Sequence, residues 1–113
     1  MKVEALATLP QFESAVPGDG EITSVYCADL LSWAMGRAPA NSAWCTIMGN
    51  VNAIAVAALA DVAVIVLCEN AVLDDDAKAK ATQQGVAIVK TSLPAFEAGL
   101  AIAKAADLYK ERR

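Results

Sequence analysis

The chain has 113 residues, 57% of them hydrophobic and 5% aromatic, with a formal net charge of −4 and a pI near 4.6. This acidic balance, with no run of Lys or Arg except in residues 110–113, argues against nucleic-acid binding, which needs a clustered positive surface. Asp61 interrupts the longest apolar stretch, so no segment reaches the roughly 18 apolar residues of a membrane span. Residues 1–13 also lack the apolar region of a secretory signal. We therefore expect a cytoplasmic protein in which residues 1–113 form one domain.

The N-terminal quarter predicts one helix and two strands. Residues 3–9 suit a short helix that ends at Pro10, because proline disfavours helical conformation in the residue before it. Residues 11–16 suit an edge strand followed by a turn at 17–20. Residues 22–27 are rich in β-forming side chains and predict the first clear strand.

A second helix is predicted after this strand. Asp29 stands directly before an apolar segment and is a natural N-cap, because its carboxylate can accept hydrogen bonds from the first helical turn. Gly36 is placed to end the helix in a left-handed conformation. A polar loop over residues 37–42 follows.

The central segment predicts a strand–helix–strand unit. Apolar residues 43–48 form a short run, Gly49 and Asn50 form a turn, and the alanine-rich residues 52–60 favour a helix. Residues 62–68 are aliphatic or β-branched with almost no polar position. A strand that is apolar on both faces must be covered on both faces, so we expect residues 62–68 at the centre of the sheet.

The C-terminal segment predicts two helices separated by a strand. Asp74, Asp75 and Asp76 suit a helix start, where acidic residues favour the dipole; the alternative is a cation site. That helix ends at Gly85, and a strand covers residues 86–90. Thr91 and Ser92, before Pro94, suit the start of a last helix. We expect its apolar stripe to be Phe96, Gly99, Leu100, Ala103 and Ala106, with Glu97, Lys104, Asp107 and Glu111 on the other side.

Alternation of helices and strands indicates the fold class. It predicts an α/β protein, a three-layer α/β/α sandwich with a mostly parallel sheet of four or five strands. Ligands of such sheets bind outside the carboxyl ends of the strands. The polar residues at these ends are the candidate ligand-binding residues: Asp29, Thr46, Gly49, Asn50, Asn52, Glu69, Thr91 and Ser92. The alternative is that most of them only cap helices.

Three cysteines, Cys27, Cys45 and Cys68, lie in three different predicted strands and would converge if those strands are neighbours. Because there is no CxxC pair, we interpret them as buried reduced thiols. The alternative is that the three thiolates bind a soft metal ion. The sequence has no histidine, no phosphate-binding glycine loop and no GxSxG elbow. We therefore expect no catalytic residue, no cofactor and no metal.

Three segments carry a resemblance to the DRTGG domain family in its small stand-alone form: ITSVYCADLLSWAM (22–35), AWCTIMGNVNAIAVAALADVAVIVLCE (43–69) and AIVKTSLPAFEAGLAI (87–102). The DRTGG string itself is absent. The resemblance implies an α/β/α domain similar to the N-terminal domain of HPr kinase/phosphorylase. DRTGG domains occur as accessory domains of regulated pyrophosphatases, where they tend to dimerise.

Two functions are therefore predicted. The first is a non-catalytic regulatory or interaction domain, a homodimer that serves a regulated partner protein, with Trp33, Met35 and Trp44 contributing to an exposed apolar patch. The alternative is a sensor of a small molecule, a nucleotide or other phosphate compound, bound at the strand ends. An enzyme is the third and least supported reading.

Overall fold

Helices and strands alternate along the chain. The computed structural model describes residues 1–110. In chain order the elements are α1 (Val3–Leu6), β1 (Phe12–Val16), β2 (Ser24–Cys27), α2 (Leu31–Arg37), β3 (Ser42–Thr46), α3 (Val51–Ala60), β4 (Val64–Leu67), α4 (Asp75–Gln84), β5 (Ile88–Thr91) and α5 (Ala95–Ala105).

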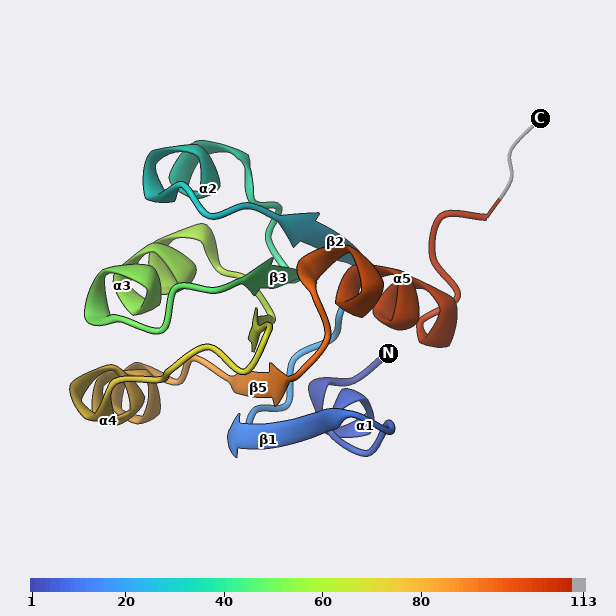
Figure 1. Cartoon of the computed structure of the whole chain (residues 1–113). Coiled ribbons are helices and arrows are strands. Elements are labelled where there is room, and N and C mark those ends of the chain that lie inside the picture. The colour runs from blue at the N-terminus through green and yellow to red at the C-terminus, as the bar shows by residue number, and fades with distance from the viewer. Residues whose placement is uncertain (111–113) are drawn as a thin grey trace.

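Within residues 1–110 the strands form one five-stranded sheet in the order β1-β5-β4-β3-β2 (Figure 1). Strands β2 to β5 are parallel, and β1 pairs with β5 in the antiparallel direction. The prediction of a mostly parallel sheet of four or five strands is confirmed.

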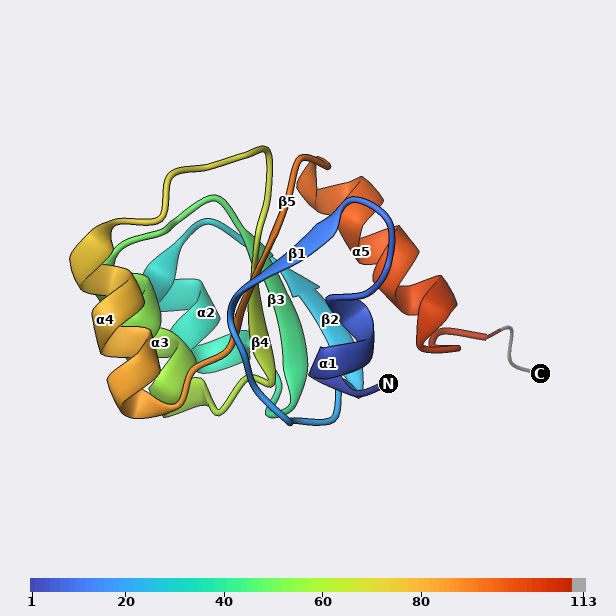
Figure 2. The ribbon, with the colours of Figure 1, turned by 90° about the horizontal axis from the view of Figure 1, so that it is seen from below.

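Helices cover both faces of the sheet (Figure 2). Helices α2, α3 and α4 form one layer, and α1 and α5 lie on the opposite face. The predicted α/β sandwich is therefore confirmed. None of the described helices is long and apolar enough to cross a membrane.

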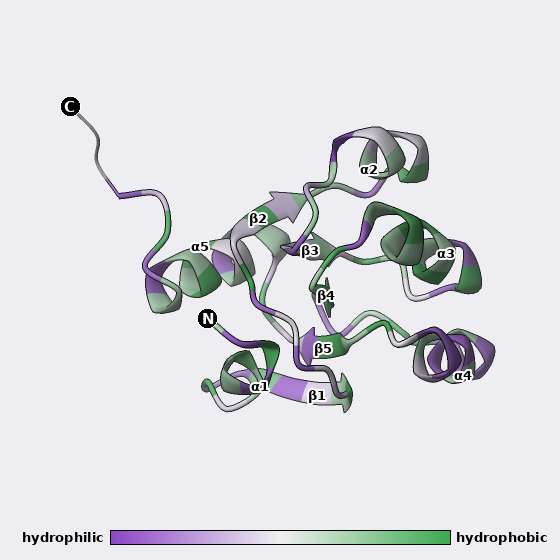
Figure 3. Ribbon diagram, turned by 180° about the vertical axis from the view of Figure 1, so that it is seen from behind, coloured by the Kyte–Doolittle hydropathy of each residue, from purple (hydrophilic) through white to green (hydrophobic). Residues whose placement is uncertain are grey.

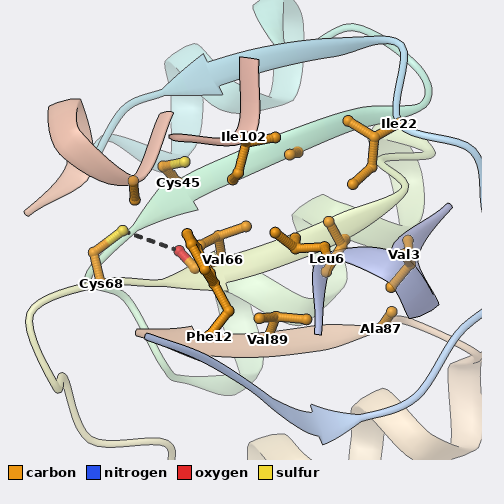
Figure 4. Close-up of a cluster of buried hydrophobic side chains, with 13 residues drawn as sticks. Val3, Leu6, Phe12, Ile22, Cys45, Val66, Cys68, Ala87, Val89 and Ile102 are labelled. Carbon is orange, nitrogen blue, oxygen red and sulfur yellow. Dashed lines mark hydrogen bonds between the residues drawn. The ribbon is translucent and has the colours of Figure 1, made fainter. Parts of the chain in front are cut away.

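Strand β4 lies at the centre, between β3 and β5, and each of its residues is 1% exposed or less. Its side chains alternate between two cores. Ile65 and Leu67 pack with residues of α2, α3 and α4, whereas Val64 and Val66 pack with residues of α1 and α5 (Figure 4). The prediction that residues 62–68 run through the middle of the molecule is confirmed for this strand.

The second helix differs from the prediction at both ends. Leu30, not Asp29, occupies the N-cap position of α2, and no side chain caps the helix. Asp29 accepts other hydrogen bonds, described below. Gly36 lies inside α2 without a positive φ, and the helix continues to Arg37. The first helix is also shorter than predicted, ending at Leu6.

Helix α5 turns a different side to the sheet than predicted. Ala98, Gly99 and Ile102 are buried, whereas Phe96 is 76% exposed and Leu100 is 47% exposed. The predicted stripe is therefore wrong at Phe96 and Leu100, whereas Gly99 is buried and Ala103 and Ala106 are partly buried. Small residues face the sheet because α5 lies close to β2: a Cβ on Gly99 would lie 3.2 Å from Cγ1 of Val25. The predicted position of Glu111 falls outside the described residues.

Candidate functional site

Asp29 joins the end of β2 to the end of β3. Its Oδ1 accepts a hydrogen bond from the Thr46 hydroxyl at 2.7 Å and another from the Ile47 N–H at 2.9 Å. The Thr46 Oγ1 in turn accepts from the Met48 N–H at 3.3 Å. Thr46 is fully buried, so its hydroxyl needs such a partner. The structure thus brings these two predicted site residues together as a bridge between neighbouring strand ends.

Gly49 and Asn50 shape the turn between β3 and α3. Asn50 is the N-cap of α3, and its Oδ1 accepts from the Ala53 N–H at 2.9 Å. A Cβ on Gly49 would lie 3.0 Å from the Leu73 Cα and closer still to the Val72 carbonyl oxygen. Glycine is therefore required here by the close approach of the loop that follows β4. Both residues have a structural reason for their identity.

Of the other residues expected to act as caps, none does so. Asn52 lies inside α3 and is exposed. Pro94, not Ser92, occupies the N-cap position of α5. The Thr91 hydroxyl, which is buried, accepts from the Leu93 N–H at 3.2 Å and so shapes the turn that leads into α5.

A hollow of about 390 Å³ lies where β5 ends beside the start of β1. Thr91 and Ser92, both predicted site residues, line it. The remaining lining residues are Gln11, Phe12, Glu13, Asn70 and Lys90. The hollow is at the carboxyl edge of the parallel strands, as the rule for open α/β sheets predicts. Its lining carries one cation and one carboxylate besides neutral polar groups.

The backbone beside this hollow is left-handed at three non-glycine residues: Gln11 (φ 71°), Glu69 (φ 58°) and Asn70 (φ 53°). Such conformations are disfavoured outside glycine and are over-represented at functional sites. The Glu69 N–H donates to the Leu93 carbonyl at 3.0 Å, and the Asn70 N–H donates to the Thr91 carbonyl at 3.1 Å. These bonds hold the end of β4 against the end of β5.

The eight predicted site residues therefore do not share one pocket. Six of them, Asp29, Thr46, Gly49, Asn50, Asn52 and Glu69, do not line the hollow. Five residues that do line it were missed: Gln11, Phe12, Glu13, Asn70 and Lys90. No sequence signal marks Gln11, because it reaches the hollow only through the antiparallel pairing of β1 with β5. Ligand binding by the predicted residues stays a prediction.

The three thiols do converge. Cys27 and Cys45 are register partners on β2 and β3, and all three cysteines are free. Cys45 and Cys68 belong to the core on the α5 side and lie at the same end of it (Figure 4). Hydrogen bonding with the Cys45 thiol lowers the pKa of Cys27 to about 7, against the opposing effects of burial and of Asp29. Among the described residues, no three Cys, Asp or Glu side chains are arranged to hold a metal ion.

Comparisons with known proteins give a structural likeness but no match in sequence. No protein-family model matches the sequence, and no curated protein matches it. A solved structure does match, with a TM-score of 0.70 and 11% sequence identity, over 92% of this chain and 46% of the other. It contains the CBS and DRTGG domains of the regulatory region of Clostridium perfringens pyrophosphatase, complexed with the activator diadenosine tetraphosphate. The present chain thus spans about half of that one, and at this identity the likeness shows the fold alone.

Proposed function

We propose that this chain is a non-catalytic regulatory domain of the DRTGG type, and that it forms a homodimer through the outer side of α2 and α3. The likeness to part of a pyrophosphatase regulatory region supports both the DRTGG assignment and the regulatory role. The lack of histidine supports a role without acid–base catalysis, which histidine most often performs.

The observation that carries the dimer is a largely apolar surface without a carboxylate. Between Asp29 and Asp61 the only charged residue is Arg37, whose guanidinium carbon lies 3.9 Å from the ring centroid of Trp33. Figure 3 shows α3 as mainly apolar and α2 as mixed, in contrast with the hydrophilic α4. We call six exposed residues of this region the α2–α3 surface: Leu30, Trp33, Met35, Asn52, Ala58 and Leu59. Trp44, which was expected to join the patch, is fully buried and does not.

A second copy of the chain is the occupant that the charges favour. In a two-fold dimer each surface meets its own copy, so a charged surface would meet like charge. The chain has a net charge of −4, yet the α2–α3 surface carries no carboxylate. It can therefore meet itself without repulsion between carboxylates while removing large side chains from water, Leu59 at 72% exposure among them.

A pair of matched lysine substitutions tests the dimer. Leu59 and Gln83 are exposed residues at the same position in the last turn of α3 and α4, where a cation suits the helix dipole. Leu59→Lys should weaken self-association at least about tenfold, roughly 1.4 kcal/mol, because it buries an unpaired ammonium in the contact. Gln83→Lys should leave it unchanged. Analytical ultracentrifugation over a range of concentrations measures both.

The proposal fails if the unaltered chain sediments as a monomer at high micromolar concentration. It also fails if Leu59→Lys and Gln83→Lys associate equally well. Circular dichroism should give both variants the parent thermal midpoint at a concentration where each is monomeric, because both side chains face solvent in the monomer.

A nucleotide or phosphate sensor is the second candidate, and the hollow of about 390 Å³ at Thr91 and Ser92 favours it. Its volume lies within the usual range of small-molecule sites, and Lys90 supplies a cation. The solved structure to which this chain is similar was crystallised with a dinucleotide activator, which suggests the compounds to screen.

Thermal unfolding with diadenosine tetraphosphate, ATP or inorganic phosphate tests the sensor. A ligand at about 100 times its Kd should stabilise the fold by about 2.7 kcal/mol through mass action. Ser92→Trp, which fills the hollow, should abolish that shift, whereas Gln83→Trp on α4 should preserve it. The candidate falls if none of the three compounds raises the midpoint of the unaltered chain.

A further inference from the structure

Three thiols that no part of the proposed function uses lie together at the α5 face of the sheet. Cys27 ends the edge strand β2 and is exposed, whereas Cys45 and Cys68 are fully buried. Cys27 also contacts α5, because its Sγ lies 3.8 Å from the Ala95 carbonyl oxygen and would lie 3.4 Å from a Cβ on Gly99. One thiol of the cluster thus faces solvent, and its strand neighbour lies directly behind it.

We propose that Cys27 and Cys45 form a thiol oxidation site that takes hydroperoxides, with Cys27 as the attacking thiol and Cys45 as the resolving thiol. The two residues are register partners in adjacent parallel strands. Adjacent strands lie about 4.8 Å apart, within the Cα–Cα range of roughly 4.4–6.8 Å that a disulfide needs. The spacing of the two strands therefore allows the link.

The chemistry balances with the peroxide as the only oxidant. The Cys27 thiolate attacks one peroxide oxygen, the O–O bond breaks, and the leaving alkoxide or hydroxide takes up a proton. The Cys45 sulfur then attacks the sulfur of the resulting sulfenic acid. The S–S bond forms, the S–O bond breaks, and the hydroxyl leaves as water with the Cys45 proton. Two thiols lose two electrons, and the hydroperoxide gains them.

The electrostatic surroundings divide the two roles. Side-chain hydrogen bonding among the three thiols lowers the pKa values of Cys27 and Cys68 and raises the pKa of Cys45. Burial and the negative charge of Asp29 act against ionisation of Cys27. The α5 residues beside Cys27, Ala95 and Gly99, have no titratable side chain. With a pKa of about 7, Cys27 is about half thiolate at neutral pH, whereas an ordinary thiol is a few per cent ionised. Cys68 is also activated but lies out of solvent reach.

Thiol counting tests the site. The reduced full chain is treated with a small excess of hydrogen peroxide, unfolded, and alkylated with N-ethylmaleimide for intact mass analysis. Two of the three thiols should disappear, leaving one adduct, and peptide mapping should find the Cys27–Cys45 bond. Limiting N-ethylmaleimide on the folded chain should label Cys27 first, with a rate that rises through about pH 7.

Single variants assign the roles. Cys27→Ser, at an exposed position that does not endanger folding, should keep both remaining thiols reduced. Cys45→Ala should leave a sulfenic acid on Cys27 that dimedone traps, and Cys68→Ala should form the bond as the parent does. A Cys45–Cys68 bond, a Cys27 bond between two molecules, or survival of all three thiols in the folded parent would overturn the proposal.

Discussion

Helices α3 and α4 are neighbours in one layer, yet only α4 has an outer side of charged and polar residues. Each is a ten-residue helix that follows a parallel strand. Helix α3 buries Ala53, Ile54, Val56 and Ala57, and α4 buries Ala77 and Ala81. The outer side of α4 is covered by charged and amide side chains, whereas α3 has no charged residue at all. Equal positions in the fold therefore do not explain the difference, which the proposed dimer contact through α3 would explain.

The ends of the two helices differ as well. The Asn50 side chain caps α3, whereas Asp74 at the same position of α4 makes no capping bond and is followed by two further aspartates. Helix α3 ends at Asp61 in a left-handed conformation (φ 60°), and α4 ends at Gly85 with φ 71°. Helix α4 thus relies on the macrodipole and a glycine, and α3 on a side-chain cap and its packing.

The largest loss in the free energy of unfolding should come from a substitution at the contact between the start of α3 and the start of α4. Gly49, before α3, accepts a hydrogen bond from the N–H of Asp74, the N-cap residue of α4, at 2.9 Å. Gly49→Ala would drive a Cβ into the backbone of Val72 and Leu73. We expect a loss of about 1–3 kcal/mol in the free energy of unfolding, as for other overpacked sites. Urea unfolding followed by circular dichroism measures it, and a loss within about 0.5 kcal/mol, typical of an unconstrained surface site, would show that the loops do not meet there.

Substitutions at the N-caps of α3 and α4 should cause smaller losses of stability, and the two losses should differ. Asn50→Ala removes a side-chain cap and should lower the free energy of unfolding by about 1 kcal/mol. Asp74→Ala removes no capping bond and should cost about 0.5 kcal/mol or less, the value of one exposed charge at the dipole. The same urea titration compares them. Equal losses would mean that the two caps are equivalent after all.

The sequence predicted the order of elements and the central strand, because aliphatic runs and turn residues are local signals. Residues 62–68 were placed correctly from their composition alone. The roles of Asp29 and Gly36 were predicted wrongly. Asp29 has partners 17 and 18 residues away, at the end of β3, and such a tertiary contact overrides the local capping preference. Only Thr91 and Ser92 of the hollow were predicted, since the contribution of β1 depends on an antiparallel pairing that no local pattern encodes. The buried side of α5 was misread because its stripe of small residues resembles the solvent side of a helix.

The smallest effect should come from Gly36, inside α2. Nothing in the chain lies within 4 Å of a Cβ placed there, and its φ is not positive, so the monomer gives no reason for glycine. Gly36→Ala should therefore raise the free energy of unfolding of the monomer by about 0.5–1 kcal/mol. If a second copy approaches α2 closely, the same methyl group should weaken the dimer. The comparison is Ala79→Gly on exposed α4, which should lower monomer stability by a similar amount and leave association unchanged. Gly36→Ala should thus raise the free energy of unfolding measured in urea and weaken the association measured by ultracentrifugation. If both the free energy of unfolding and the association rise, the α2 part of the surface lies outside the contact.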